Sequence, residues 1–337
     1  MKAYQLTAQT GPDALRLCDL PEPHPGPGQV TVRVHATSLN YRDLMIASGR
    51  YGAPVALPLV PLSDGAGEIA AVGEGVTRWR PGDRVAGTFF QHWHTGPIRR
   101  EAFQAALGGS LNGMLAEVVA LAAEGVVAIP AHLSFEEAAT LPCAAVTAWN
   151  AVVTNGKVAA DYTVLVLGTG GVSLFALQFA KLHGARVIVT SSSDEKLTRA
   201  KALGADATIN YRTTPDWDQE AFRLTDKEGV DHVVEVGGRD TFPKSLRALA
   251  LGGTVSVIGG VSGFTSEVPL RDILGRSALV RGIYVGNRDM FEAMNRAIAR
   301  HQLKPVVDRV FPFAEASAAY RYQESGTHFG KVVIRLL

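Results

Sequence analysis

The feature that most constrains the fold is an apolar run that leads directly into a glycine-rich turn. The run Tyr162–Leu167 has the length of a strand, and Gly168–Ser173 (GTGGVS) follows it. A helix is predicted over Val172–His183, with Gly184 placed to end it in a left-handed conformation. The first glycine permits a tight turn and the second lets the backbone approach a pyrophosphate at the start of the helix. The third position of the usual pattern is a serine here, but the place of the turn between strand and helix still indicates dinucleotide binding.

The chain beyond this turn repeats the rhythm of strand and helix. The next strand is predicted over Arg186–Thr190 and the next helix over Asp194–Leu203. Apolar strands that alternate with helices indicate a parallel sheet covered on both faces. The sequence therefore predicts an α/β unit with a doubly wound parallel sheet over residues 131–285. Its further strands are expected at Ala207–Asn210, His232–Val236 and Thr254–Ile258.

The N-terminal part of the chain has a different pattern. Val30–Ala36 (VTVRVHA) alternates apolar and polar residues, as a half-buried strand does, and Arg84–Gly87 is a further short strand. In the tail, a helix is predicted over Asp289–Arg300 and a closing strand over Lys331–Leu336. We expect residues 1–130 and 286–337 to form one β-rich domain, with the α/β unit inserted between its two segments.

The end of the second strand of the α/β unit carries information about the nucleotide. It ends in three serines, Ser191–Ser193, with no carboxylate at the tip. An acidic residue there would bind a ribose 2′-hydroxyl and repel a 2′-phosphate, whereas hydroxyl groups can donate to a phosphate. Lys196 and Arg199 add positive charge, although Asp194 and Glu195 act in the opposite direction. The sequence therefore favours NADPH over NADH as the cofactor.

Charge and cysteine content argue against several other classes of protein. The chain has 33 Lys+Arg and 32 Asp+Glu, so its net charge of +1 gives no support to a nucleic-acid or polybasic membrane partner. The two cysteines, Cys18 and Cys143, exclude a four-cysteine zinc lobe and argue against a disulfide framework. The N-terminus has no apolar signal-peptide region, and the apolar runs are too short to span a membrane. We expect a cytoplasmic protein that acts on a small molecule.

These patterns together resemble those of the medium-chain dehydrogenase/reductase superfamily. The resemblance covers essentially the whole chain, and the segments that carry it are Gly65–Glu68 (GAGE), Gly82–Val85 (GDRV), Gly168–Ser173, Lys201–Ala205 (KALGA) and Gly330–Ile334 (GKVVI). It implies a Rossmann domain that binds NAD(P), together with a GroES-like catalytic domain formed from both ends of the chain.

The resemblance is weaker at the metal ligands. The alcohol dehydrogenase branch of the superfamily holds a catalytic zinc with a cysteine, a histidine and a second cysteine. The matching positions here are Asn40, Ser63 and Cys143. One thiol beside an amide and a hydroxyl is not a zinc site, and a substitute site that uses Asp43 and Asp64 is disfavoured.

A structural zinc is not expected either. The segment that carries it in that branch is here Phe89–Met114, which has no cysteine. Its two histidines, His92 and His94, lie on either side of Trp93, and no third ligand is evident. We interpret this pair as part of a polar loop anchored by the tryptophan, and we predict that the chain binds no metal.

At these positions the sequence is similar to the zinc-free branch of the superfamily, which includes the quinone oxidoreductases and enoyl-type reductases. That branch has an asparagine at the first vacated position, here Asn40, and a tyrosine further along, here Tyr51. The resemblance to that branch implies that Lys196 and Tyr211 bind the 2′-phosphate and that Thr147 contacts the nicotinamide. The residues assigned to the cofactor on this basis are Asn40, Thr147, Gly168, Gly170, Gly171, Val172, Ser191, Ser192, Lys196, Tyr211, Gly259, Val285 and Lys331.

Hydride transfer without a metal requires hydrogen bonds to the oxygen on which negative charge develops, and then a proton. Tyr51 is the predicted proton donor, because a phenol with a pKa of about 10 is a credible acid toward an enolate. Asn40 is the second predicted catalytic residue and would donate to the substrate carbonyl or to the nicotinamide ribose. Both have structural alternatives, Tyr51 as a packed aromatic and Asn40 as a turn residue. Cys143 lies in an apolar stretch and is expected to be inert.

The predicted function is a zinc-independent, NADPH-dependent oxidoreductase that reduces a quinone or an α,β-unsaturated carbonyl. Two alternatives remain open: an alcohol dehydrogenase with an unorthodox zinc site, and a nucleotide-binding protein that is not an enzyme. The apolar segment Ala278–Val285 is expected at the edge of the sheet, where an unprotected strand invites pairing. Members of the family dimerise in this way, so the resemblance implies a homodimer.

Overall fold

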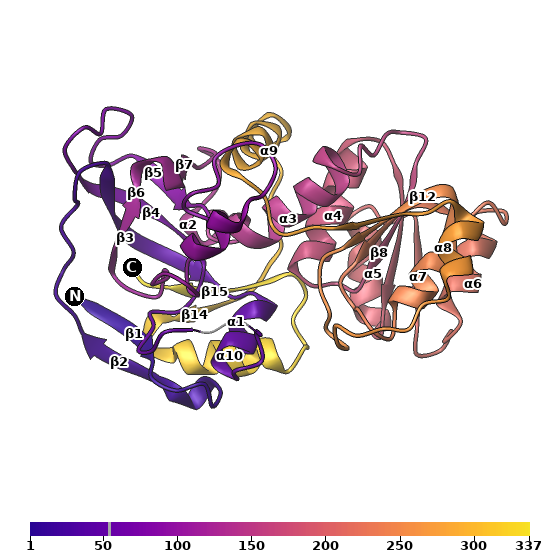
Figure 1. Ribbon diagram of the computed structural model, residues 1–337, viewed down its shortest axis with the longest axis horizontal. Coiled ribbons are helices and arrows are strands. Elements are labelled where there is room, and N and C mark those ends of the chain that lie inside the picture. Colours follow the sequence, from indigo (N-terminus) through magenta and orange to yellow (C-terminus); the bar gives the residue numbers. More distant parts are fainter. Residues whose placement is uncertain (53–54) are drawn as a thin grey trace. The chain divides into compact units, whose positions relative to one another are not determined.

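The computed structural model describes residues 1–52 and 55–337, which form two compact units (Figure 1). The β-rich unit comprises Met1–Val146 and Gly286–Leu337, and the Rossmann unit comprises Thr147–Val285. Residues 131–146, which the sequence analysis assigned to the α/β domain, pack within the β-rich unit. The reason is a long-range contact: the hydroxyl of Ser38 donates to the carbonyl of Ala139 over 2.8 Å, which holds this segment against the sheet of the β-rich unit.

All strands of the Rossmann unit that the structure describes run parallel, in the order β10-β9-β8-β11-β12-β13. The chain starts in the middle of the sheet with β8, adds strands on one side, and then returns to build the other side. This is the predicted doubly wound α/β arrangement. The strands are β8 (Thr163–Leu167), β9 (Arg186–Ser191), β10 (Ala207–Asn210), β11 (Val230–Glu235), β12 (Leu249–Val257) and β13 (Leu279–Gly282).

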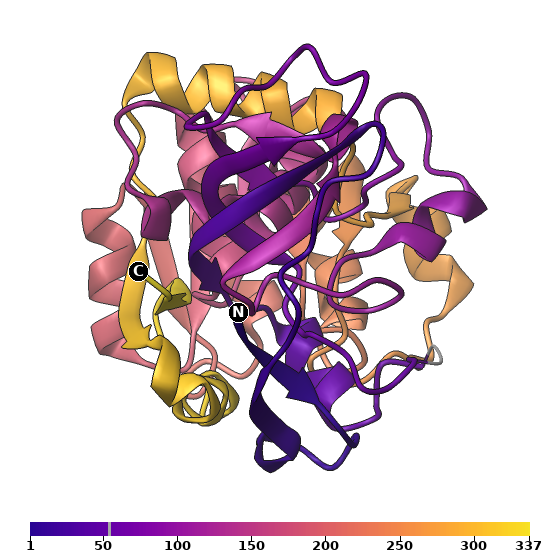
Figure 2. The ribbon, with the colours of Figure 1, turned by 90° about the vertical axis from the view of Figure 1, so that its left-hand side faces the viewer.

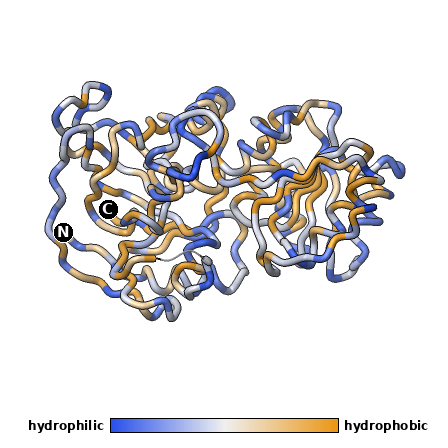
Figure 3. The backbone as a smooth tube through the Cα atoms, in the orientation of Figure 1, coloured by the Kyte–Doolittle hydropathy of each residue, from blue (hydrophilic) through white to orange (hydrophobic). Residues whose placement is uncertain are grey.

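The helices of the Rossmann unit start and stop where the sequence provides caps. The side chain of Ser193 accepts a hydrogen bond from the Lys196 amide at the start of α5, and Gly184 and Gly204 follow α4 and α5 with φ values of 80° and 102°. The strands between the helices are mainly hydrophobic, as Figure 3 shows, and their side chains form the core of the unit. The helices are α4 (Gly171–Leu182), α5 (Asp194–Ala202), α6 (Trp217–Leu224), α7 (Phe242–Ala248) and α8 (Leu270–Arg276).

The β-rich unit is built from a mostly antiparallel sheet, which faces the viewer in Figure 2. Its strand order is β14-β15-β3-β4-β5-β7, with β6 paired to β3, and a separate hairpin joins β1 to β2. The closing strand pairs with β3, which confirms that the tail packs with the N-terminal part. The strands are β1 (Lys2–Leu6), β2 (Leu15–Asp19), β3 (Gln29–Ser38), β4 (Asp64–Val72), β5 (Arg84–Gly87), β6 (Val118–Ala122), β7 (Val126–Ala128), β14 (Val307–Pro312) and β15 (Lys331–Arg335).

Few helices accompany this sheet. α1 leaves the end of β3, and α10 lies beside α1 and β15. A helical stretch, with α3 between two π-helical turns, carries the chain onward from residue 141 to residue 154. The helices outside the Rossmann sheet are α1 (Tyr41–Ala47), α2 (Phe135–Ala138), α3 (Val146–Trp149), α9 (Arg288–His301) and α10 (Ala316–Glu324).

The first turn of α9 anchors a loop of the β-rich unit. The amides of Arg288 and Asp289 donate to the carbonyls of Trp93 and His94, each over 3.1 Å. These amides belong to the first helical turn, which has no carbonyl partners within the helix, so the loop carbonyls cap the helix while the helix fixes the loop. The tail of the chain thereby holds the segment that follows β5.

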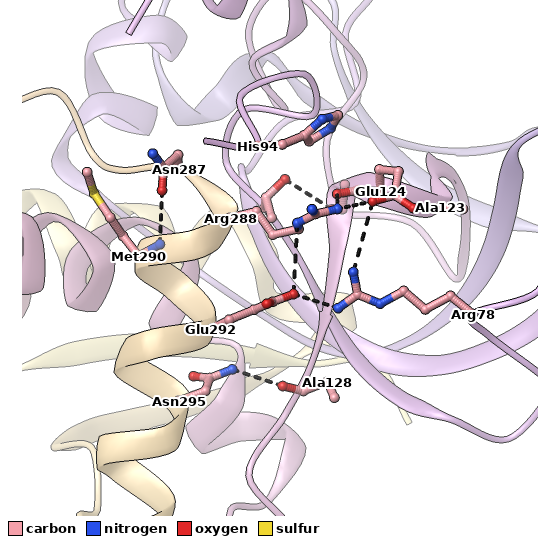
Figure 4. A network of polar contacts seen from close by, with 12 residues as sticks. Arg78, His94, Ala123, Glu124, Ala128, Asn287, Arg288, Met290, Glu292 and Asn295 are labelled. Atoms are coloured by element: carbon pink, nitrogen blue, oxygen red, sulfur yellow. Dashed lines mark hydrogen bonds and ion pairs between the residues drawn. The ribbon is translucent and has the colours of Figure 1, made fainter. Parts of the chain in front are cut away.

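Charged side chains surround this anchor (Figure 4). Arg288 pairs with Glu124, and Arg78 pairs with Glu292 over 2.5 Å. Arg78 and Glu124 are largely exposed, with side-chain exposures of 40% and 55%, so their pairs contribute little to stability. The backbone hydrogen bonds, rather than these ion pairs, therefore position the loop.

The helices described for residues 1–52 and 55–337 are all too short or too polar to cross a bilayer.

A buried histidine makes the Rossmann unit sensitive to acid. His232 on β11 is fully buried, and neither ring nitrogen has a hydrogen-bond partner among the residues that the structure describes. Burial lowers its pKa from 6.5 to about 4. Between these values the unfolded chain binds the proton more readily than the folded one, so this group removes stability as the pH falls from 6.5 to 4.

We expect the free energy of unfolding to fall by about 2 kcal/mol between pH 7 and pH 5 through His232 alone. The measurement is urea unfolding of the wild type and of His232→Leu at both pH values. The variant should lose less stability than the wild type by that amount. An equal loss in the two proteins would show that His232 does not titrate as proposed.

Candidate functional site

The glycine turn of the Rossmann unit is shaped for an anion. Gly168 follows β8 with a φ of 75°, a left-handed conformation that favours glycine. Helix α4 begins at Gly171, and no side chain caps its first turn. A Cβ atom placed on Gly170 would meet nothing within 4 Å, so the space before the helix is open. The first-turn amides, including that of Val172, and the positive end of the helix dipole suit a phosphate there.

Ser173 explains how the turn tolerates the loss of its third glycine. Its side chain is buried, and the hydroxyl donates to the carbonyl of Leu167 at the end of β8 over 2.7 Å. The small side chain therefore fits between helix and strand, and its polar group is satisfied there. The departure from the usual pattern leaves the phosphate-binding part of the turn unchanged.

The residues predicted to select the nucleotide lie at neighbouring strand ends. Ser191 ends β9 opposite Asn210 of β10, and its carbonyl accepts a hydrogen bond from the amide of Tyr211 over 3.0 Å. Lys196 follows in the first turn of α5, after Ser192 and the capping serine. The sheet and the helix start thus bring the serines, the lysine and the tyrosine to one corner of the unit.

An acidic residue at the start of α5, Asp194, has a local hydrogen-bond partner. The Oδ1 atom of Asp194 accepts a hydrogen bond from the side chain of Asn210 over 2.7 Å. This contact ties the start of α5 to β10. The carboxylate therefore has a structural partner within the Rossmann unit.

The remaining cofactor candidates divide between the two units. Thr147 is buried in α3, Gly259 follows β12, and Val285 adopts a φ of 51° while its carbonyl accepts from Asn150 over 2.7 Å. These three belong to the Rossmann unit, whereas Asn40 and Lys331 belong to the β-rich unit. The first-turn amides of α4, together with the polar side chains at the ends of β9 and β10, fit a nicotinamide dinucleotide.

A cluster of buried polar groups lies where β3 passes into α1. Asn40 joins the two elements, and its backbone amide donates to Oδ2 of Asp43 over 2.8 Å. This contact caps the first turn of α1 with a carboxylate. Burial raises the pKa of Asp43 to about 6, although the neighbouring Arg42 acts in the opposite direction.

Lys331 supplies a buried cation to this cluster. It is buried at the start of β15, and its Nζ atom donates to the carbonyl of Leu39 over 2.5 Å and to Oδ1 of Asn40 over 2.6 Å. Oδ2 of Asp64 lies 3.7 Å away. The two buried charges therefore compensate each other, and the side-chain oxygen of Asn40 faces the ammonium group.

Asp64 is held by further donors. Its Oδ1 atom accepts from the hydroxyl of Ser63 over 2.7 Å, and its Oδ2 atom accepts from the amide of Cys143 over 3.2 Å. Burial and the nearby Asp64 raise the pKa of the Cys143 thiol well above its ordinary value. The thiol is therefore protonated and unreactive at neutral pH, as the sequence predicted.

Tyr51 joins this cluster through an arginine. The Arg42 guanidinium lies 5.2 Å from the centre of the Tyr51 ring and 4.8 Å from that of Phe89, and it donates to Oδ1 of Asp43 over 3.2 Å. Burial is the largest single influence on the pKa of Arg42 and acts to lower it, but Asp43, Tyr51 and Cys143 together raise the pKa above its ordinary value, so the arginine stays charged. Asn40 and Tyr51, the two predicted catalytic residues, thus belong to one connected network.

The same residues do not fit a catalytic zinc. Asn40 and Ser63 offer an amide and a hydroxyl where zinc prefers imidazole or thiolate, which leaves Cys143 as the one thiol at the three matching positions. The ammonium group of Lys331 already contacts Asn40 and lies near Asp64, so a second cation there would meet its positive charge. Within the described ranges no group of three or more His, Cys, Asp or Glu residues is arranged to hold a metal ion.

The histidines of the loop after β5 have ordinary surroundings. Trp93 is buried, and its ring nitrogen donates to the carbonyl of Gly96 over 3.0 Å. His94 contacts the carbonyl of Gln91 over 3.1 Å, and His92 is exposed. The loop is anchored by its tryptophan, in agreement with the interpretation of its sequence.

The sequence alone does not reveal the charged cluster. Asp43 and Asp64 were considered only as a disfavoured substitute for zinc ligands, and Lys331 was assigned to the cofactor. A lysine directly before the apolar residues of a closing strand was the available signal, because a charge at the start of a buried strand needs a partner. Its partners come from segments almost three hundred residues away, which periodicity cannot place.

Comparison with known proteins identifies the family. A model of the alcohol dehydrogenase GroES-like domain matches residues 26–131, and a model described as zinc-binding dehydrogenase matches residues 171–300. A zinc-type alcohol dehydrogenase-like protein of Schizosaccharomyces pombe is 49% identical over 316 residues, which cover 92% of this chain and 91% of the relative. The crystal structure of an NAD-dependent alcohol dehydrogenase is 38% identical, with a TM-score of 0.92 and full coverage of both chains.

A quinone oxidoreductase of Pseudomonas aeruginosa is also similar, at 32% identity over 95% of this chain and 94% of the relative. It is less similar than the two alcohol dehydrogenase relatives above, so the predicted place in the quinone oxidoreductase branch stays a prediction. The Rossmann and GroES-like folds are confirmed by the matches along both units. The chain belongs to the medium-chain dehydrogenase/reductase superfamily and is an NAD(P)-dependent oxidoreductase of that family.

Proposed function

We propose that this oxidoreductase works without zinc and transfers hydride to a small molecule with an activated double bond, either a quinone or an α,β-unsaturated carbonyl. The observation that supports the proposal is the set of side chains at the positions where related enzymes hold zinc. Asn40 and Ser63 replace two ligands there, and the Lys331 ammonium contacts the asparagine over 2.6 Å. A site with this composition must stabilise negative charge by hydrogen bonds.

The Asn40 carboxamide is arranged to do so. Its oxygen accepts from Lys331, while its Nδ2 atom is buried and has no partner among the described residues. NAD(P)H, when bound, supplies the hydride. As hydride reaches the β-carbon of an enone, the electron pair of the double bond moves toward the carbonyl oxygen. Asn40 Nδ2–H donates to that oxygen, and Tyr51 delivers the proton that completes the saturated carbonyl product.

A second candidate is an alcohol dehydrogenase, which moves hydride between an alcohol and NAD(P)⁺. The names of the more similar relatives favour it. The donor set at Asn40, Ser63 and Cys143 disfavours it, because that reaction in its zinc-dependent form needs a metal to hold the alkoxide. A nucleotide-binding protein without activity is the third possibility, and it would leave the buried cluster without a role.

The decisive experiment measures metal content and turnover on the same sample. We expect protein purified without chelators to contain far less than one zinc per chain. After dialysis against a chelator it should still oxidise NADPH with an enone or a quinone. One zinc per chain, with chelator-sensitive alcohol oxidation that zinc restores, would establish the alcohol dehydrogenase instead. Nucleotide binding without turnover of any of these substrates would indicate a binding protein.

Tyr51→Phe tests the proton donor within this assay. We expect turnover of the enone to fall roughly 10²–10⁴-fold, the usual range for a general acid, with NADPH binding unchanged. A quinone should be less affected, because its reduced oxygens can take protons from water. Tyr162→Phe, in the other unit, is the matched control. Wild-type rates with both substrates would show that Tyr51 only lines the site.

We further propose that NADPH is preferred over NADH. Ser191 and Ser192 carry no charge at the ribose position, Asp194 is engaged by Asn210, and Lys196 stands at the start of α5. We expect Lys196→Ala to weaken NADPH binding by roughly 1–3 kcal/mol and NADH binding hardly at all. Lys201→Ala removes the same charge from the other end of the helix and serves as the control. Equal losses for the two nucleotides would refute a phosphate contact.

The proposed assembly is a homodimer formed through β13. This strand is at the edge of the parallel sheet, with Leu279 and Val280 exposed to 51% and 38%. On α8, Leu270 and Leu274 are exposed to 81% and 83%. An open edge next to exposed apolar side chains favours pairing with a second copy.

We expect sedimentation at micromolar concentration to give a dimer for the wild type and a monomer for Val280→Lys. Leu17→Lys, an exposed position on β2, is the control and should leave the dimer intact. A wild-type monomer would rule out the assembly.

A further inference from the structure

We propose that Lys331 is a positioning residue, which fixes the carboxamide of Asn40 so that its nitrogen donates to the substrate oxygen. This inference rests on the proposed function and goes beyond it by giving Lys331 a role other than cofactor binding. Lys331 is buried to 97% of its surface, and the described contacts of its ammonium group lie within the β-rich unit.

The sheet brings Lys331 to this place. Strand β15 pairs antiparallel with β3, with Val333 opposite Ser38, and the amide of Leu39 donates to the carbonyl of Val332 over 3.0 Å. The first residue of β15 therefore lies beside the two residues that follow β3. Because ladder hydrogen bonds set this register, the lysine reaches Asn40 without depending on a flexible loop.

The chemistry of the contact decides how the carboxamide is turned. An ammonium group can only donate, so the group of Asn40 that faces Lys331 must be the oxygen. The 2.6 Å distance to Oδ1 fits a charge-assisted hydrogen bond. The Nδ2 atom is then directed away from the lysine, and its two protons remain available.

The Nδ2 donor of Asn40 costs folding free energy unless a ligand accepts a hydrogen bond from it. Asn40 is 8% exposed, its Nδ2 atom is buried, and the described part of the chain offers that atom no acceptor. A buried donor without a partner costs free energy, so such groups are rare in native proteins and often mark functional sites. The backbone amide of Asn40 also donates to Asp43, so both the backbone and the side chain of Asn40 are held in place.

The charge of Lys331 is itself held in place. Asp64 lies 3.7 Å from Nζ and is in turn held by Ser63 and Cys143. A positive charge of the protein thus stands behind the carboxamide and polarises its N–H groups toward the substrate. In this way a lysine provides the positive field, and an amide provides the contact with the oxygen.

A double-mutant cycle in kcat tests the proposal, with the enone and NADPH as substrates. We expect Asn40→Ala to lower kcat about 100-fold, as the loss of one oxyanion donor does. Lys331→Met should lower it 10- to 100-fold, with the KM for NADPH within threefold of wild type. The double variant should be no slower than Asn40→Ala alone, because Lys331 acts through that side chain.

Two further variants separate positioning from folding. Lys331→Met leaves Asp64 as an unpaired buried charge, so Asp64→Asn/Lys331→Met removes both charges and should restore thermal stability without restoring kcat. Lys331→Arg keeps the cation and should recover at least part of kcat. Recovery of wild-type kcat by the charge-free pair would show that Lys331 is only structural.

The outcomes distinguish this inference from the proposed function. Wild-type turnover by Asn40→Ala would remove the donor on which both depend. A slow Asn40→Ala with a Lys331→Met variant at the wild-type rate, or with losses that multiply in the double variant, would refute the positioning role alone. A large rise in the KM for NADPH in Lys331→Met would instead assign the lysine to the cofactor.

Discussion

The pairing of β15 with β3 is the interaction on which the β-rich unit depends. It joins the last strand of the chain to one that begins at residue 29, and so closes a sheet whose two segments are separated by the whole Rossmann unit. The same ladder sets the position of Lys331 beside Leu39 and Asn40. Loss of this pairing would open the sheet and disperse the polar cluster, so fold and site depend on the same hydrogen bonds.

The cluster illustrates how buried charges can be retained. Arg42, Asp43, Asp64 and Lys331 are all nearly inaccessible to water, and each has an oppositely charged neighbour. Burial of single charges is expensive, but backbone groups at Leu39, Leu107 and Cys143 each form one hydrogen bond with a charged side chain of the cluster. Replacing such groups with apolar ones can even stabilise a protein. Their presence together beside an unsatisfied amide donor therefore supports a chemical rather than a purely structural role.

The names of the relatives and the residues at the metal-ligand positions indicate different chemistry for this protein. The more similar relatives carry the name of alcohol dehydrogenases, and one domain model is described as zinc-binding. Those comparisons report similarity over nearly the whole chain. Metal chemistry depends on three or four side chains, so residues such as Asn40 and Ser63 at the ligand positions can change it without disturbing the fold. The side chains of the site, rather than overall similarity, therefore determine the substrate class.

Local pattern was sufficient for much of the fold. The apolar run before Gly168, the capping serine at position 193 and the glycines at 184 and 204 each fix a turn or a helix end through short-range physics, and the elements lie close to where these residues predict them. The family resemblance also gave Asn40 and Tyr51 as candidates. Tertiary structure alone decided that residues 131–146 join the β-rich unit, because their partners are hydrogen-bonding groups on β3 and β4. It also decided which way the Asn40 carboxamide turns, because an ammonium group at position 331 reaches it only through long-range strand pairing.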